Sequence, residues 1–197
     1  QAAILSFNGN KLITAAGGGM VVTNDGYIAE GCRYWRNQAR ADDTEVRHDD
    51  IGYNYRLSNL QAAVGLAQLE TIEERLRRKR YIASWYDAGL LTVPGISTRP
   101  RLEGDANWLY TIKIDPVLYG WTSRDLLAML ADRGIETRPL WTPMHRLPMY
   151  ERNECLGSGV VADDLWHNCL SLPSGCGLTE GQQEAVITAI RALAREV

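Results

Sequence analysis

The stretch SFNGNKLITAAGGGMVVTND, residues 6–25, joins two strand-like segments through a glycine-rich turn. AAILSF at residues 2–7 reads as a buried strand, and MVVT at residues 20–23 predicts a second strand that ends at the turn signal Asn24-Asp25-Gly26. Lys11 follows the first strand directly. A lysine held beside a pocket there would be desolvated, which favours the neutral amine that attacks a carbonyl. Taken alone, a lysine after a strand is more often an ordinary surface charge.

The remainder of the chain alternates helical and strand-like patterns. A capping box at Ser58 and Gln61 predicts a helix that runs on to about Leu90, and Pro94-Gly95 marks a break after it. This alternation favours a small α/β layer domain. The other expected elements are a helix at 28–36, a loop at 37–50, a strand at 108–114 with Trp108, Tyr110, Ile112 and Ile114 on one face, a helix capped by Ser123 that ends at Gly134, a strand at 135–138, a helix at 163–168, a strand at 170–172 and a last helix that opens at Thr179.

Charge and hydropathy exclude several classes of protein. The net charge of −3 argues against a nucleic-acid binder, whose domain would be strongly basic. The basic run RLRRKR at residues 75–80 is interpreted as the solvated end of the long helix, where the helix dipole favours cations. No apolar run approaches the length of a membrane span, and Gln1 opens no secretory signal.

The cysteine pattern points to a reducing compartment. None of the four cysteines forms a C-x-x-C pair and only three histidines are present, so a zinc site is not expected. Cys155, Cys169 and Cys176 are near enough in sequence for a disulfide, but reduced thiols are the better interpretation. We therefore expect a cytoplasmic protein without a metal ion and with no membrane or nucleic-acid partner.

Four sequence blocks resemble the DegT/DnrJ/EryC1/StrS aminotransferases. They are the stretch quoted above, IGYNYRLSNLQAAVGLAQLE at 51–70, GIETRPLWTPMH at 134–145 and LSLPSGCGLTEGQ at 170–182. They occur in the family's order with similar spacing and together span nearly the whole chain. The resemblance implies an α/β fold of the aspartate aminotransferase type (fold type I) and pyridoxal 5'-phosphate (PLP) as cofactor.

The resemblance also implies roles for four residues. Lys11 matches the lysine that holds PLP as a Schiff base and moves the proton during amino transfer. Ser6 matches a serine that binds the PLP phosphate, although a serine at a strand end also caps backbone. Asn54 matches an asparagine that reaches the phosphate of the partner subunit's PLP, which implies a homodimer with a shared active site. Arg56 matches an arginine for the carboxylate of the amino donor, the alternative being a structural salt bridge.

Four further residues are candidates for the sugar pocket. In similar enzymes histidines near the positions of His48 and His145 line this pocket, but each residue is more often a packed or surface histidine. Arg138 and Trp141 lie in the block that would border the sugar, and Trp141 is also compatible with a core position.

The resemblance covers only the C-terminal half of such an enzyme. Residues 1–56 are expected to be a remnant of the large PLP-binding domain, and residues 57–197 a linking helix with the small C-terminal domain. The family's aspartate for the pyridine nitrogen precedes the lysine and is not present here. We therefore expect the chain to have been cut from a longer protein and the fragment alone to be inactive.

The leading hypothesis for the full-length protein is an aminotransferase that moves the amino group of glutamate to a nucleotide-linked 4-keto-6-deoxy sugar. A UDP-linked N-acetyl sugar is the first choice and GDP-perosamine synthesis the second, either of them serving surface glycan or glycoprotein biosynthesis. A PLP-dependent sugar dehydratase is less favoured, because members with that chemistry carry histidine where this sequence has Lys11. A non-catalytic, regulatory family member is the third alternative.

Overall fold

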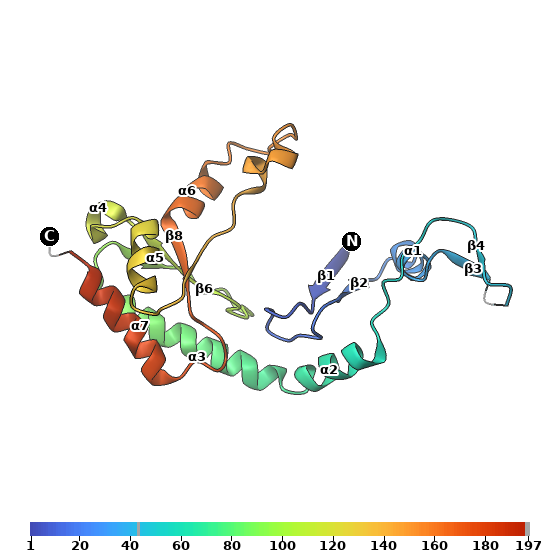
Figure 1. Cartoon of the computed structure of the whole chain (residues 1–197), viewed down its shortest axis with the longest axis horizontal. Helices are drawn as coiled ribbons and strands as arrows, with labels where there is room; N and C mark the ends of the chain where they lie inside the picture. The colour runs from blue at the N-terminus through green and yellow to red at the C-terminus, as the bar shows by residue number, and fades with distance from the viewer. Residues whose placement is uncertain (43, 196–197) are drawn as a thin grey trace. The chain divides into compact units, whose positions relative to one another are not determined.

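A computed structural model describes residues 1–42 and 44–195, and it divides into two compact units. Unit 1 comprises residues Gln1–Arg75 and unit 2 comprises Leu76–Val197. Each unit is described by itself, with the element labels of Figure 1. The elements that lie within unit 1 are β1 (Ala2–Ser6), β2 (Gly19–Thr23), α1 (Gly26–Arg36), β3 (Arg40–Asp42), β4 (Arg47–His48) and α2 (Asn59–Leu69). The next helix, α3 (Ile72–Leu90), begins just before the division.

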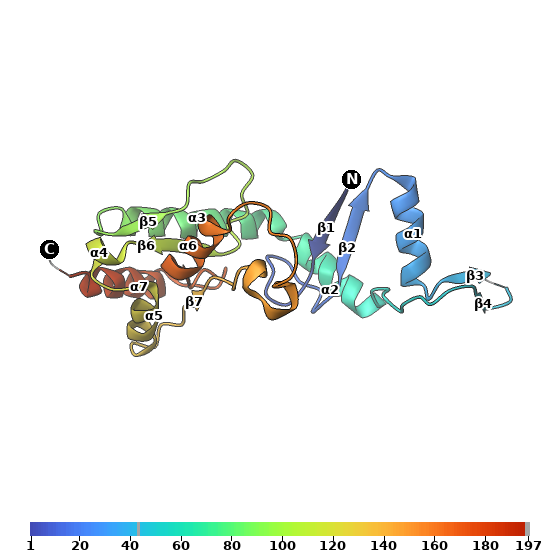
Figure 2. The same ribbon diagram turned by 90° about the horizontal axis from the view of Figure 1, so that it is seen from above.

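Unit 1 opens with the antiparallel hairpin of β1 and β2, which lie side by side in Figure 2. Its register pairs Ala2 with Thr23 and Ser6 with Gly19. Gly19 is required at this point, because a Cβ there would lie 2.6 Å from the carbonyl oxygen of Leu5. The two predicted strands are confirmed, but the predicted burial of the first strand is wrong, since every residue of β1 is exposed. Strand propensity and burial are separate properties, and the described residues of unit 1 leave both strands of this hairpin largely exposed.

The segment predicted as a loop contains a second hairpin. Strands β3 and β4 pair antiparallel with an irregularity between Arg40 and Asp42. Asp25 is the N-cap of the preceding helix α1, and its carboxylate accepts hydrogen bonds from the amides of Tyr27 and Ile28. Short, polar strands of this kind carry no alternating pattern, which is why the sequence did not reveal them.

The single long helix predicted from Ser58 to Leu90 is two helices. The Ser58–Gln61 capping box is confirmed and starts α2, but α2 ends at Leu69 and α3 begins at Ile72. At the break, the hydroxyl and amide of Thr71 both bond the carbonyl oxygen of Gln68. Side-chain hydrogen bonds of this local kind compete with the helical ladder.

Unit 2 is an α/β layer domain around one antiparallel sheet of strand order β5-β6-β8-β7. Its α/β class agrees with the prediction. Besides most of α3, its elements are β5 (Ile96–Thr98), β6 (Tyr110–Ile114), α4 (Pro116–Tyr119), α5 (Ser123–Ala131), β7 (Arg138–Pro139), the 3-10 helices η1 (Met144–Arg146) and η2 (Pro148–Tyr150), α6 (Val160–Asn168), β8 (Cys169–Leu172) and α7 (Glu180–Leu193).

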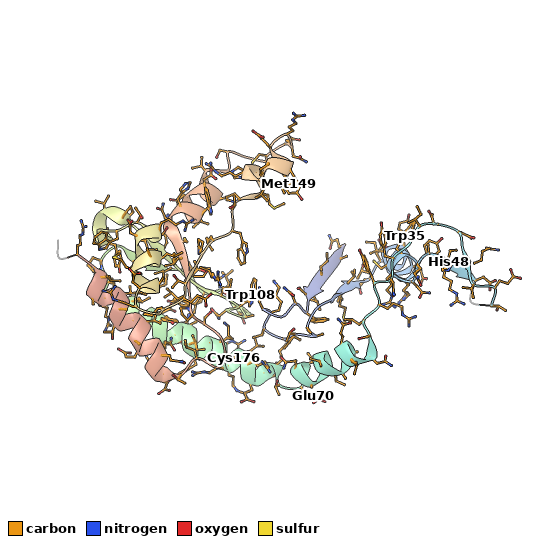
Figure 3. All side chains as sticks on the ribbon, in the orientation of Figure 1. Trp35, His48, Glu70, Trp108, Met149 and Cys176 are labelled. Carbon is orange, nitrogen blue, oxygen red and sulfur yellow. The ribbon has the colours of Figure 1, made fainter. Side chains whose placement is uncertain are left out.

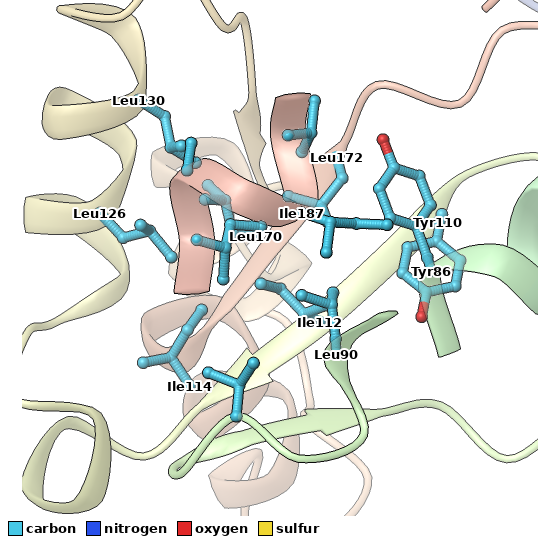
Figure 4. Close-up of a cluster of buried hydrophobic side chains, with 14 of the residues drawn as sticks. Tyr86, Leu90, Tyr110, Ile112, Ile114, Leu126, Leu130, Leu170, Leu172 and Ile187 are labelled. Atoms are coloured by element: carbon cyan, nitrogen blue, oxygen red, sulfur yellow. The ribbon is translucent and has the colours of Figure 1, made fainter. Parts of the chain in front are cut away.

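The core of unit 2 lies between this sheet and the helices α3, α5 and α7. Tyr110, Ile112 and Ile114 of β6 point to it, as the alternation of the sequence predicted. Figure 4 shows them packed against side chains of the three helices and of β8. The intervening Lys113 points to the other face, where it pairs with Asp164 of α6. The helix residues that fill the core include Ile82, Tyr86, Leu90, Leu126, Leu130, Ile187 and Ile190.

The prediction that the basic run at 75–80 is the solvated end of a helix is wrong. It lies within α3, and Lys79 is only 4% exposed. Its ammonium group donates to the carbonyl oxygen of Trp108 at 2.7 Å and to that of Ser174. Contacts at sequence separations of 29 and 95 residues fix this lysine, so no local pattern could have predicted its burial.

Two predicted helix starts are also corrected. Thr122 rather than Ser123 is the N-cap of α5, where it forms a capping box with Asp125. The hydroxyl of Ser123 instead donates to the carbonyl oxygen of His167. Helix α6 starts at Val160, three residues before the predicted start. The strand predicted at 135–138 is wrong except at Arg138, because β7 consists of Arg138 and Pro139.

Candidate functional site

Ser6 is the last residue of β1, and Lys11 lies in the turn that follows this strand. The amide of Lys11 donates to the carbonyl oxygen of Asn8 at 3.1 Å, and the carbonyl oxygen of Phe7 accepts from the amide of Ala15 at 3.0 Å. Ser6 is exposed and Lys11 half-buried. The Ser6 hydroxyl has one long contact, 3.5 Å to the amide nitrogen of Asn8. The end of β1 and the turn after it therefore present a hydroxyl and an amine five residues apart in sequence, on a backbone fixed by hydrogen bonds.

Helix α2 supports this turn from within unit 1. Ala15 is only 1% exposed. A Cβ added at Gly65 of α2 would lie 3.4 Å from the Cβ of Ala15, so the helix passes close to the turn. Gly18 adopts a φ of +78°, which glycine tolerates best, and lies against the side chain of Leu57. Gly18 thus allows a tight turn and close packing. Gly65, within α2, allows close packing against Ala15.

The chain has three lysines, and their environments differ. Burial lowers the pKa of Lys79 to about 8, a value suited to a nucleophile, but its ammonium group is enclosed by carbonyl oxygens and has no approach for a substrate. The pKa of Lys113 is raised by its hydrogen bond to Asp164. A low pKa in an inaccessible place is a structural property, so Lys79 is not a candidate for the reactive amine.

Asn54 and Arg56 gather at the carboxyl end of α1. Asn54 forms an isolated antiparallel bridge with Asn37, and Nη1 of Arg56 lies 3.4 Å from Oδ1 of Asn37. The amide of Tyr55 donates to the carbonyl oxygen of Arg36 at 3.0 Å. In an extended segment alternate residues share one side, so Asn54 and Arg56 point the same way. Both side chains are exposed.

His48 belongs to the same neighbourhood, at the base of the β3–β4 hairpin (Figure 3). Its Nδ1 lies 2.8 Å from the carbonyl oxygen of Gln38. Because a carbonyl only accepts, Nδ1 carries the proton and Nε2 is directed away from this contact. Gln38 and Ala39 both have positive φ, and a Cβ at Gly52 would lie 2.2 Å from the amide nitrogen of Ala39. The close approach of the backbone at Gly52 to that of Gln38 and Ala39 fixes the carbonyl group that His48 contacts.

The remaining candidates lie in unit 2. Trp141 is 67% exposed, so it is not a core residue, and its ring stacks on that of Trp108 with centroids 6.0 Å apart. Arg138 is exposed and pairs with the neighbouring Glu136. His145 Nε2 lies 3.1 Å from Oδ1 of Asp163.

The predicted site residues therefore form three groups. Ser6 and Lys11 lie at the end of β1 and in the turn after it. His48, Asn54 and Arg56 surround the end of α1. Arg138 lies in β7 of unit 2, and Trp141 and His145 lie on the segment that follows it. None of these residues lines the hollow of about 770 Å³ in unit 1 between β2, α1 and the chain from Tyr53 to Leu57. Throughout residues 1–42 and 44–195 no group of three or more acidic, histidine or cysteine residues is arranged to hold a metal ion, and no helix is long and apolar enough to cross a bilayer.

Sequence reasoning missed the partners that hold these candidates. Asn37 and Gln38 orient the second group, and Trp108 and Asp163 contact the third. These contacts join residues 10 to 33 positions apart, and the partners have no motif of their own. Only a structure could assign them, although Asp163 was correctly placed on a helix.

Comparisons with known proteins identify the family to which this chain is similar. Residues 1–191 match the model of the DegT/DnrJ/EryC1/StrS aminotransferase family. Bacillus subtilis EpsN, which carries the name of a pyridoxal phosphate-dependent aminotransferase, is 40% identical over 191 residues, 93% of this chain and 48% of the relative. A GDP-perosamine synthase of Caulobacter vibrioides is 35% identical over 192 residues, 95% of this chain and 51% of that enzyme.

The fold comparison agrees. The crystal structure of the aminotransferase TlmJ from Streptoalloteichus hindustanus superposes with a TM-score of 0.88 at 28% identity, covering 98% of this chain and 52% of TlmJ. The chain thus spans about half the length of the proteins that it matches. On the match of nearly its whole length, the chain belongs to the DegT/DnrJ/EryC1/StrS aminotransferase family.

Proposed function

We propose that this chain is the part of a PLP-dependent sugar aminotransferase that carries the reactive lysine, Lys11. The observation that supports the proposal is the placement of Ser6 at the end of β1 and of Lys11 in the hydrogen-bonded turn that follows it, in a chain of this family. An amine and a hydroxyl on such a turn suit the aldehyde and the phosphate of PLP. A Cβ at Gly9, between them in sequence, would meet no atom within 4 Å, so the turn has open space on that side.

In this proposal each residue has one task. Ser6 would donate a hydrogen bond to a phosphate oxygen of the cofactor. Lys11 would hold the cofactor through its amine, with loss of water, and would carry a proton at Nζ once released from it. Arg56 pairs with the carboxylate of glutamate, since a guanidinium binds a carboxylate through two parallel hydrogen bonds. PLP, when bound, supplies an electron sink for the carbon that loses its proton.

Asn54 gives the proposal its oligomeric part. Its exposed amide lies beside Arg56 on a segment tied to α1 by backbone hydrogen bonds. We assign it to the cofactor phosphate of a second subunit, so that the full-length protein is a homodimer with shared active sites. A protein of this kind would work in the cytoplasm, where nucleotide sugars are made.

The proposed acceptor is a nucleotide-linked 4-keto-6-deoxy sugar, and we assign roles in its binding to His48, His145, Arg138 and Trp141. A UDP-linked N-acetyl sugar remains our first candidate on the sequence blocks. Relatives at 35% and 37% identity carry the name GDP-perosamine synthase, and this specific observation favours a GDP-linked sugar as the second candidate. Either product would serve the synthesis of surface glycans or glycoproteins.

The test uses the full-length protein with glutamate and a set of UDP- and GDP-linked keto sugars. Lys11→Ala should lower amino transfer by roughly 100-fold to 10,000-fold, the range for removing a group that moves a proton in the reaction. Borohydride reduction should leave the cofactor on the peptide that contains Lys11 in the wild type and on no peptide of the variant. Lys113→Ala, which removes only an exposed ion pair with Asp164, is the matched control. Unchanged transfer in Lys11→Ala would refute the proposal.

The same assay separates the alternatives. A sugar dehydratase would release a deoxygenated product without an amino group. A regulatory protein without catalysis would keep its biological effect after Lys11→Ala.

A further inference from the structure

The chain between β7 and α6 has little regular structure of its own. Residues 140–159 contain only the short 3-10 helices η1 and η2, and the views of Figures 1 and 2 show them as an excursion from unit 2. A segment without a hydrogen-bonded ladder needs side-chain contacts to hold one course. This segment carries Trp141 and His145, two of the proposed sugar-binding residues, so its anchors bear on substrate binding.

The carboxylate of Asp163, in the first turn of α6, is the main anchor. Its Oδ1 accepts from Nε of Arg146 at 2.5 Å, and its Oδ2 accepts from Nη2 of the same guanidinium at 2.8 Å. Oδ1 also lies 3.1 Å from Nε2 of His145. One carboxylate thus contacts two adjacent residues of η1, and because it only accepts, it fixes the proton of His145 on Nε2.

His145 and Arg146 each have a second packing contact besides Asp163. A Cβ at Gly159 would lie 2.8 Å from Cε1 of His145, so the imidazole fits against a residue that has no side chain. The guanidinium of Arg146 lies over the ring of Trp166 with 5.5 Å between Cζ and the ring centroid. His145 and Arg146 are therefore each held between Asp163 and a second contact.

This network differs from an ordinary surface ion pair. Isolated exposed pairs contribute roughly 0 to 1 kcal/mol and fix little. Here the pairing is bidentate, it is shared with a histidine, and the side chains of Asp163 and His145 are 24% and 27% exposed. The hydrogen bond from Arg146 lowers the pKa of Asp163 to about 2, so the carboxylate stays ionised across the physiological range.

We infer that Asp163 is a positioning residue for the sugar-nucleotide substrate. It holds the chain from Trp141 to Arg146 in one course and sets the orientation of His145, without itself touching the substrate. The inference rests on the proposed function. It assigns to α6 a task in substrate recognition, beyond covering the face of the sheet opposite the core.

The neighbouring Asp164 provides a matched control. It lies on the same helix, forms an ion pair with Lys113 at 2.5 Å, and bonds Asn168 at 2.8 Å, but it has no contact with η1 among the described residues. Asp163→Asn and Asp164→Asn therefore remove the same charge at adjacent positions. Only the first removes an anchor of the proposed sugar-binding segment.

The experiment compares the full-length variants in steady-state kinetics and in limited proteolysis. Asp163→Asn should raise the KM for the sugar nucleotide about 10-fold and leave kcat, the KM for glutamate and the cofactor content within about twofold, as expected when binding common to ground and transition states is lost. Trypsin should cut after Arg146 and Arg152 faster in this variant. Asp164→Asn should match the wild type in both measurements, and Asp163→Glu should restore part of the affinity.

Each outcome decides the inference. Equal kinetics for the two asparagine variants, or an equal rise in the KM for glutamate, would overturn it and leave the proposed function standing. A wild-type enzyme that aminates no sugar nucleotide would refute the proposed function first. If Asp163→Asn does not fold, Arg146→Gln removes the bidentate pair from the other side and must show the same selective rise in KM, or the inference fails.

Discussion

The two units of this chain differ sharply in what they bury. In unit 2 the side chains of Tyr86, Leu90, Ile112 and Leu130 are completely inaccessible to solvent. Among the described apolar residues of unit 1 only Ala15 and Ala39 are buried. The larger apolar side chains of its hairpin and of α2 are exposed, with Ile4 at 81%, Met20 at 49%, Leu60 at 82% and Leu66 at 58%.

The difference teaches where the folding free energy of the chain comes from. A buried apolar side chain stabilises the fold by about 1.5 to 3 kcal/mol relative to an exposed one. Unit 2 has a contiguous core of such side chains, so it meets the cost of ordering its own backbone. Unit 1 has secondary structure and hydrogen bonds but almost no apolar burial, and exposed apolar surface of this extent is typical of a face that packs against other protein.

The most drastic way to test the comparison is to divide the chain between α2 and α3. Residues 72–197 alone should unfold cooperatively in urea and show a near-ultraviolet circular dichroism signal from packed aromatic rings such as Tyr86 and Tyr110, whose centroids are 4.7 Å apart. Residues 1–71 alone should show neither property. A cooperative transition in the shorter fragment would mean that its hairpins and α2 stabilise one another without a core.

Two leucines give the next largest effect. Leu130 of α5 is 0% exposed and Leu60 of α2 is 82% exposed. Leu130→Ala should lower the free energy of unfolding of the 197-residue chain by about 2 to 5 kcal/mol, whereas Leu60→Ala should change it by less than about 0.5 kcal/mol. Urea titrations followed by circular dichroism measure both values. Similar losses for the two variants would contradict the assignment of the core to unit 2 alone.

The pH dependence of unit 2 provides a smaller effect with a definite sign. Burial lowers the pKa of Lys79 from 10.5 in the unfolded chain to about 8 in the folded one. Between these values the unfolded chain holds a proton that the folded chain has released, so the free energy of unfolding rises with pH, at most by about 1.4 kcal/mol per pH unit. Between pH 8 and 10 the wild type should therefore gain stability relative to Lys79→Met.

Lys113 is the control for this measurement. Its hydrogen bond with Asp164 raises its pKa above 10.5, so its contribution is fully present below pH 10.5 and is lost only above that value. Lys113→Met should therefore shift the curve of stability against pH without changing its slope between pH 8 and 10. A slope equal to that of Lys79→Met would show that the lysine environments do not differ as described.

Local chemistry made much of this fold predictable. The capping boxes at Ser58 and Thr179 marked the starts of α2 and α7, and period-two alternation identified β6. Three predictions failed. The burial of Lys79 depends on partners far away in the sequence, and the exposure of β1 depends on what covers the strand. The break at Thr71 comes from local hydrogen bonds that apolar periodicity does not record. Periodicity reports which face of an element is apolar, but it does not report whether anything covers that face.

The candidate site was predictable to a different degree. The positions of Ser6, Lys11, Asn54 and Arg56 came from a resemblance of motifs, and their assigned roles remain predictions. The structure adds their surroundings, such as the bridge from Asn54 to Asn37 and the contact of His145 with Asp163. Neither contact has a sequence signature, because each depends on how separate segments meet in three dimensions.

The scarcity of lysine has a practical consequence for mapping this protein's neighbours. Amine-reactive cross-linkers couple lysines, and of the three in this chain Lys79 is enclosed and Lys113 is engaged with Asp164. Such reagents would therefore record few distances from this chain. Reagents that couple carboxylates, of which the sequence offers 24 on aspartate and glutamate side chains, would give a far denser map.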